Sequence, residues 1–131
     1  FCSHPTKEIA RLILQDSAKI QEEEAEMANK NGYSKHNPAT PLYTLEEAKR
    51  VLPMFRVVEP NLEVKLADNC WFKLFYAGHV LGACSLEIHV EDKILIFSGD
   101  IGQDDDVLMY PPIKPKQADY VFLVKLLNKK Q

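Results

Sequence analysis

The chain has 131 residues, of which 46% are hydrophobic and 27% are charged. This length and composition suit one folded domain with a modest core. The net charge is -3 and the basic residues are scattered along the chain. That excludes a nucleic-acid-binding surface formed by clustered lysine and arginine of this sequence alone.

The cysteines and the apolar segments indicate the compartment. Cys2, Cys70 and Cys84 are an odd number without C-x-x-C spacing, which predicts neither a disulfide framework nor a cysteine zinc knuckle. No apolar run approaches the ~20 residues of a membrane span. The first residues also lack the charged and then apolar pattern of a signal peptide. We therefore expect a cytoplasmic location and no membrane contact.

The first predicted element is a helix over residues 7–31, which follows a strand end at residues 1–3. Its apolar positions recur with helical spacing, at Ile9, Leu12, Ile13 and Ile20. Asp16 falls on the same stripe. Because a carboxylate on a buried face needs a partner, we expect Asp16 to bond a loop backbone or a basic side chain rather than to act in catalysis.

A loop and a second helix are predicted next. Residues 33–43 contain two prolines and no periodicity, which is typical of an extended loop. His36 lies in this loop; it is either a plain surface residue or a contact to substrate or phosphate. Thr44 and Glu47 have the spacing of a capping box, which opens a helix over residues 44–55 that is halted near Pro53.

The rest of the chain is predicted to form strands. Residues 57–58, 62–66 and 70–76 are expected strands, and the aromatic residues of the last one are expected in the core rather than as a base-stacking platform. Residues 84–91 alternate apolar and polar side chains and turn at 91–92 into the apolar run 93–97, which predicts an antiparallel hairpin. This alternation puts His89 on a polar, exposed face.

The segment after the hairpin is predicted to be irregular. It includes Asp104, Asp105 and Asp106, which we interpret as a solvated loop rather than a cation site. Residues 118–123 look like one further core strand.

Two polar residues stand at predicted strand ends. Gly78 and Gly82 flank His79, and Gly99 and Gly102 flank Asp100, so both lie on loops whose backbone can turn tightly. Imidazole and carboxylate are zinc ligands. The spacing alone is a weak indication of a shared metal.

The motifs around these residues resemble a known family. The stretch AGHVLG at 77–82, followed by FSGDIG at 97–102, resembles the third and fourth metal-binding motifs of the metallo-β-lactamase fold. The form is that of the β-CASP branch of nucleic-acid hydrolases, which includes RNase J-like enzymes and the pre-mRNA 3′-end-processing endonuclease. Residues 14–26 and 32–43 also resemble RNA-processing exonucleases of this branch. The resemblance covers about residues 1–123.

The resemblance implies a fold and a mechanism. The fold is a partial metallo-β-lactamase-like (αββα) domain of the α/β class, with a mainly antiparallel sheet. His79 would bind one of two zinc ions and Asp100 would bridge them. A metal-activated water would attack the phosphorus of RNA. The implied activity is that of a metal-dependent RNA-processing hydrolase.

Two departures from the family pattern accompany the matches. The main metal motif, His-x-His-x-Asp-His, is absent from this sequence, where His4, His36 and His89 are isolated. After residues 120–123, Val124 stands where the family has an acidic residue, and the β-CASP domain does not follow. We therefore expect an internal fragment of a catalytic domain, inactive on its own, whose full-length parent binds RNA.

Two alternatives stay open. One is another hydrolase of the same fold that cleaves thioesters or lactones, although helix 7–31 and loop 33–43 resemble the RNA branch instead. The other is a non-catalytic interaction or oligomerisation module. Exposed sheet edges would favour a homo-oligomer in that case.

Overall fold

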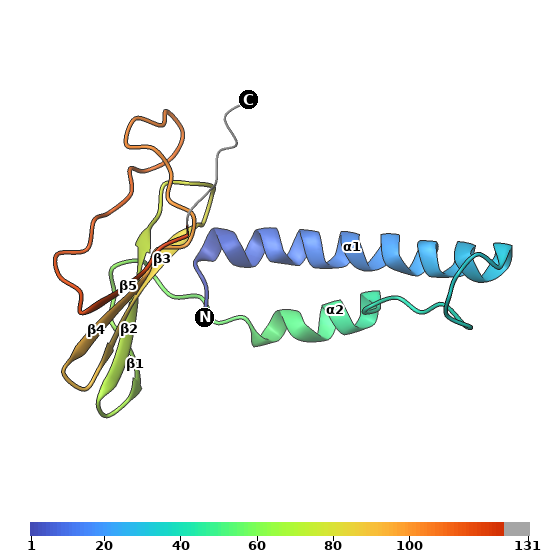
Figure 1. Cartoon of the computed structure of the whole chain (residues 1–131), viewed down its shortest axis with the longest axis horizontal. Coiled ribbons are helices and arrows are strands. Elements are labelled where there is room, and N and C mark those ends of the chain that lie inside the picture. Colours follow the sequence, from blue (N-terminus) through green and yellow to red (C-terminus); the bar gives the residue numbers. More distant parts are fainter. Residues whose placement is uncertain (125–131) are drawn as a thin grey trace. The chain divides into compact units, whose positions relative to one another are not determined.

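A computed structural model describes residues 1–124 as an α/β protein with one five-stranded sheet (Figure 1). The segment beyond Val124, part of which carries the departure from the family pattern, lies outside the described residues. The elements in chain order are α1 (His4–Asn31), α2 (Leu45–Val51), the 3₁₀ helix η1 (Leu52–Met54), β1 (Val64–Ala67), β2 (Cys70–Tyr76), β3 (Cys84–Val90), β4 (Lys93–Phe97) and β5 (Tyr120–Phe122). The predicted α/β class is confirmed.

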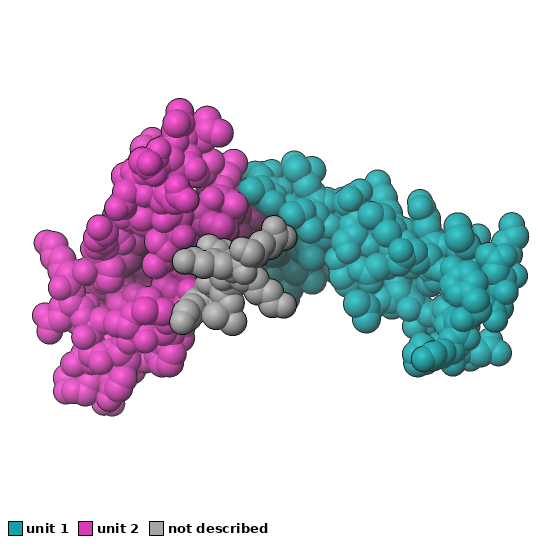
Figure 2. All heavy atoms as spheres, turned by 45° about the horizontal axis from the view of Figure 1, so that its top comes forward, with its two compact units in different colours: residues 1–2, 7–56 teal, residues 3–6, 57–131 magenta. Residues whose placement is uncertain are grey.

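The chain groups into two compact units (Figure 2). The helical unit comprises residues 1–2 and 7–56, and the sheet unit comprises residues 3–6 together with the chain from residue 57 onward. Each unit is described by itself below. The prediction that they form a single domain stays a prediction.

The helical unit is built on α1, which begins three residues before the predicted start and ends at the predicted residue. Gly32 follows it with φ +68°, and its N–H donates to the carbonyl of Ala28 at 2.9 Å, as in a left-handed helix cap. The apolar stripe is not buried as expected. Leu12 and Ile13 are 61% and 59% exposed, whereas the buried positions of the helix are alanines.

The second helix confirms the predicted capping box. The Thr44 hydroxyl accepts from the Glu47 N–H at 3.2 Å, and the Glu47 carboxylate accepts from the Thr44 N–H at 2.8 Å. The last turn tightens into η1 at Pro53, where the helix was expected to stop. Between the helices, Asn29 exchanges two hydrogen bonds with the backbone of Ala39, which anchors the predicted loop.

The sheet unit has the strand order β1-β2-β3-β4-β5. The first four strands are antiparallel neighbours, and β5 pairs with β4 in parallel. The predicted hairpin is thereby confirmed. The final strand is present but shorter than predicted, and it is not the expected core strand, because Tyr120, Val121 and Phe122 are each more than half exposed. β1 begins two residues later than predicted, and the expected strand 57–58 is reduced to an isolated bridge at Val57. None of the helices in the described range could cross a membrane.

One face of the sheet contradicts the simple alternation rule. Across the β2–β3 pair, Phe75 lies opposite Ser85 and Lys73 opposite Glu87. We expected the polar side of β3 to be exposed, but Ser85 and Glu87 are only 8% and 6% exposed. The reason is that larger side chains of the neighbouring strands share this face, among them Phe75 and Ile96, and cover the polar groups.

Candidate metal centre

The strand order brings the two predicted ligands together. His79 lies in the loop between β2 and β3, and Asp100 follows β4. Because β2 and β4 both run antiparallel to β3, their C-terminal ends lie at the same end of the sheet. The Nε2 atom of His79 is 3.7 Å from the Oδ2 atom of Asp100.

A glycine contact fixes the two loops against each other. The N–H of Gly102 donates to the carbonyl of Ala77 at 2.8 Å. A Cβ atom at Gly102 would collide with the carbonyl of Gly78, so only glycine permits this approach. Gly78 itself has φ +66°, a conformation that side chains rarely adopt. The two backbones that carry His79 and Asp100 are thereby held in contact.

The far end of the histidine loop is held by the start of the chain. The hydroxyls of Ser3 and Thr6 donate to the carbonyl of Gly82, at 2.7 and 3.0 Å. Gly82 has φ +86°, and a Cβ atom there would lie 2.7 Å from the Thr6 nitrogen. The Ala83 N–H donates to the Val80 carbonyl at 2.9 Å, which closes the turn between them. The loop is thus fixed at both ends.

The aspartate loop is fixed at its base by buried serines. The Ser85 hydroxyl donates to the Ser98 carbonyl at 2.7 Å, and the Ser98 N–H donates to the Phe122 carbonyl at 3.0 Å. The Ser98 hydroxyl donates to the Gly99 carbonyl and accepts from the Val124 N–H. All of these bonds are made by Ser98, which lies two residues before Asp100. They tie the base of the aspartate loop to β3, to β5 and to Val124.

The pair has the chemistry of two metal ligands. Neutral imidazole and carboxylate are common donors to zinc, and two donors about 2.1 Å from a tetrahedral ion lie about 3.4 Å apart. The observed 3.7 Å is close to that separation, and both side chains are accessible, with His79 38% and Asp100 44% exposed. In residues 1–124 no group of three or more His, Cys, Asp or Glu side chains is placed to hold a metal. The structure therefore places His79 and Asp100 as two metal donors would stand, and their role as ligands stays a prediction.

The nearby thiol does not extend this set. Burial raises the pKa of Cys84, and a hydrogen bond with Ser3 only partly offsets that rise. Its Sγ atom lies 3.5 Å from the Gly82 carbonyl. The raised pKa favours the protonated thiol, whereas the thiolate is the form that binds metals.

His36 belongs to the helical unit. It lies exposed in the loop after α1, where its backbone N–H donates to the Ser34 hydroxyl at 3.1 Å. Its role as a contact to substrate or phosphate stays a prediction.

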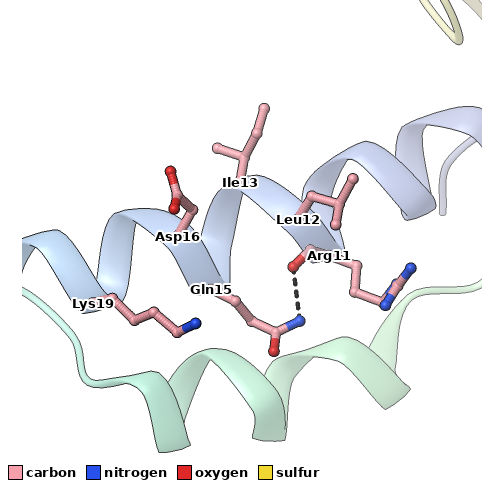
Figure 3. A pocket seen from close by; sticks show the side chains of 6 residues that line it. All are labelled: Arg11, Leu12, Ile13, Gln15, Asp16 and Lys19. Atoms are coloured by element: carbon pink, nitrogen blue, oxygen red, sulfur yellow. Dashed lines mark hydrogen bonds between the residues drawn. The ribbon is translucent and has the colours of Figure 1, made fainter.

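The expectation of a buried, bonded Asp16 is wrong. Figure 3 shows its carboxylate on the same side of α1 as Ile13, away from α2, whereas Gln15 and Lys19 extend toward α2. Asp16 is exposed, and within the described residues no hydrogen bond or ion pair of its side chain is found. The physical reason is that Leu12 and Ile13 are themselves uncovered, so this stripe has no buried face on which a partner would be needed.

The acidic loop is confirmed as solvated. Asp104, Asp105 and Asp106 are all exposed. Asp106 Oδ1 accepts from the N–H groups of Leu108 and Met109, at 2.7 and 2.9 Å, and these bonds hold the pKa of its carboxyl below the usual value. The carboxylate therefore caps a turn.

The prediction that His89 is exposed is wrong. Its ring stacks on Trp71 with centroids 3.6 Å apart and an interplanar angle of 13°. Its Nε2 atom is 2.7 Å from Glu87 Oε1, which also lies 2.8 Å from the Lys73 ammonium. The pairing of β2 with β3 would have predicted this cluster, because it places Trp71 opposite His89 and Lys73 opposite Glu87.

An α/β fold with a mainly antiparallel sheet, whose strand ends carry His79 and Asp100, is consistent with part of a metallo-β-lactamase-like domain. No family model matches the chain. It is similar to endoribonuclease ysh1 of Aspergillus fumigatus, with 28% identity over 88% of the chain and 12% of that protein. It is also similar to Integrator complex subunit 11 of Danio rerio, with 32% identity over 81% of the chain and 16% of that protein. Endoribonuclease YSH1 of Kluyveromyces lactis is 26% identical over 95% of the chain and 15% of that protein.

These relatives confirm the resemblance inferred from the motifs. They are β-CASP proteins of the metallo-β-lactamase fold, and the similarity extends over most of this chain. The chain is thus similar to proteins of the β-CASP branch over most of its length. It spans only 12% to 16% of the length of these three relatives.

Proposed function

We propose that this chain is part of the catalytic domain of a metal-dependent RNA-processing hydrolase, with His79 and Asp100 as metal ligands. The observation that carries the proposal is their 3.7 Å separation on two loops held in contact at Gly78 and Gly102. Similarity to two endoribonucleases supports RNA as the substrate class. Their names also favour cleavage within the RNA chain over trimming from an end.

The chain's own residues would position the metal. A bound zinc ion would lower the pKa of a coordinated water and offset negative charge on phosphate oxygens. His79 offers Nε2 and Asp100 offers Oδ2, both accessible to solvent and therefore to a polymer. The glycine contact keeps the two donors together before any ion binds, so little ordering of these loops accompanies binding.

Two ligands do not hold a catalytic zinc ion tightly, because such ions usually have three protein ligands. The proposal therefore requires further donors beyond the pair described here. The net charge of -3 requires likewise that cationic contacts to an RNA backbone come from elsewhere. We infer that the chain alone binds zinc weakly and is inactive or nearly so.

A zinc titration followed by NMR tests the pair directly. We expect the imidazole signals of His79 to shift before those of His4, His36 and His89. Asp100→Asn removes one anionic donor and should weaken zinc binding about tenfold or more, whereas the matched control His36→Gln should not change it. Equal zinc affinity in wild type and Asp100→Asn, or first shifts at another histidine, would rule out the pair as the metal site.

A further inference from the structure

A small apolar cavity adjoins the histidine loop. It has a volume of about 170 Å³ and lies within the sheet unit. Tyr76, Gly78 and Val80 of β2 and the histidine loop line it, together with Leu108 and Tyr110 of the segment that follows Asp100. Gly78 precedes His79 directly and contacts the glycine that follows Asp100. The cavity therefore adjoins the loop that carries His79, through the residues on either side of that histidine.

The outer wall of the cavity is held in place by backbone contacts. The Ile113 N–H donates to the Tyr76 carbonyl at 3.0 Å. A Cβ atom at Gly78 would lie 2.9 Å from the Tyr110 carbonyl and from the Pro112 ring, so this segment packs directly on the loop. Asp106 caps the turn that leads into it. The wall is thus a built feature of the sheet unit.

The lining has the chemistry of an aromatic binding site. No charged side chain lines it, and the Tyr76 and Tyr110 rings lie 5.4 Å apart at an angle of 32°. Leu108 and Tyr110 are 86% and 73% exposed, which is unusual for large apolar side chains that gather at a cavity. Pockets of this kind bind ligands with a flat apolar body and a few polar edges.

The size of the cavity selects a single ring. An apolar cavity of ~150 Å³ accommodates one benzene ring, which is close to the volume found here. Bases of single-stranded RNA stack on tyrosine rings with their edges free for hydrogen bonds. Gly78 packs on the Tyr110 segment and directly precedes His79, so the cavity is the apolar lining next to a phosphate held at the metal centre.

We propose that this cavity, lined by Tyr76, Gly78, Val80, Leu108 and Tyr110, is a subsite for a pyrimidine base next to the phosphate that the metal centre would bind. This inference rests on the proposed function, because the RNA supplies the base. It adds a preference for a single-ring base at one position of the substrate. Tyr110 provides the stacking surface.

An NMR titration with uridine monophosphate tests the subsite. We expect its binding to shift the backbone signals of Val80, Met109 and Tyr110, with ribose 5-phosphate causing no such shifts and adenosine monophosphate binding more weakly. Tyr110→Ala should weaken binding about tenfold, the loss expected for one base stack, and Tyr110→Phe should retain it. Tyr33→Ala, which alters an exposed tyrosine of the helical unit, is the matched control.

The outcomes separate this inference from the proposed function. Absence of these shifts at millimolar uridine monophosphate, equal shifts with ribose 5-phosphate, or unchanged binding by Tyr110→Ala would each overturn the subsite. The zinc titration does not depend on Tyr110, so it can support His79 and Asp100 as the metal site even when the base subsite is ruled out. In the converse case, uridine monophosphate binding depends on Tyr110 while Asp100→Asn keeps full zinc affinity. That result would support the base subsite and rule out His79 and Asp100 as the metal site.

Discussion

Glu87 shows how one residue can decide the stability of the sheet unit. Its side chain is almost fully buried, and its Oε1 atom is within 2.8 Å of the Lys73 ammonium and 2.7 Å of His89 Nε2. Lys73 also lies 5.4 Å from the centroid of the Trp71 ring. A buried ion pair adds little net stability when complete, but removal of one partner leaves the other charge uncompensated.

We predict that Glu87→Ala lowers the free energy of unfolding by about 2 kcal/mol, because it leaves the half-buried Lys73 ammonium without its carboxylate. Urea denaturation followed by the fluorescence of Trp71, which stacks on His89, measures this change. Glu63→Ala removes an exposed carboxylate and should change stability by less than about 0.5 kcal/mol. Similar losses for the two variants would show that the cluster does not contribute as described.

The sequence predicts that His79 and Asp100 lie close together, but it does not predict all the contacts that hold them there. The positions of His79 and Asp100 at strand ends follow from glycine flanks and strand patterns, and their proximity follows once the hairpin is recognised. The collision that makes Gly102 necessary was not predictable, because it depends on a backbone approach between loops more than twenty residues apart. The Tyr110 wall was missed for the same reason, since no local pattern links it to the histidine loop.

At the scale of elements, local signals predicted well and long-range ones did not. The capping box, the 91–92 turn and the helix end at Gly32 depend on neighbouring residues and are all present. The burial of Ser85 and Glu87 depends on side chains from other strands, so alternation along β3 could not predict it. The exposure of Asp16 depends on which side chains pack on its face of α1, and helical spacing in the sequence does not predict that.

The capping box of α2 yields a prediction about pH. The Thr44 backbone N–H, and then its hydroxyl, bond the Glu47 carboxylate and hold its pKa below the usual value, with Arg50 contributing less. Because the folded-state pKa is lowered, the stabilisation is complete above the ordinary carboxyl pKa. It is lost as the pH falls through the lowered value.

We therefore expect acidification through this range to lower the protection of the α2 amides, measured as the intrinsic exchange rate at each pH divided by the observed rate. Glu47→Gln should flatten that dependence on pH. Thr44→Ala should speed exchange about fivefold at neutral pH, since loss of an N-cap costs ~1 kcal/mol. Thr40→Ala, in the exposed loop before the helix, serves as the control. Protection of the α2 amides that does not change with pH in wild type would contradict the role assigned to Glu47.

At the scale of the whole molecule, the chain corresponds to a small part of the proteins that it resembles. It is similar to endoribonucleases and to Integrator complex subunit 11 but spans a small fraction of their lengths. Several large apolar side chains are exposed, among them Leu12 and Ile13 on α1 and Tyr120 and Phe122 on β5. Self-association through such surfaces stays a prediction, so metal binding has to be measured on protein of known oligomeric state.

The central claim is that His79 and Asp100 are two ligands of a metal site that needs further donors. Elemental analysis after dialysis, combined with light scattering, tests it most directly. We predict that fewer than about one zinc ion per chain is retained, and less still by Asp100→Asn, because two protein ligands hold zinc weakly. Retention of about two ions per chain would contradict the account and would mean that the site is complete.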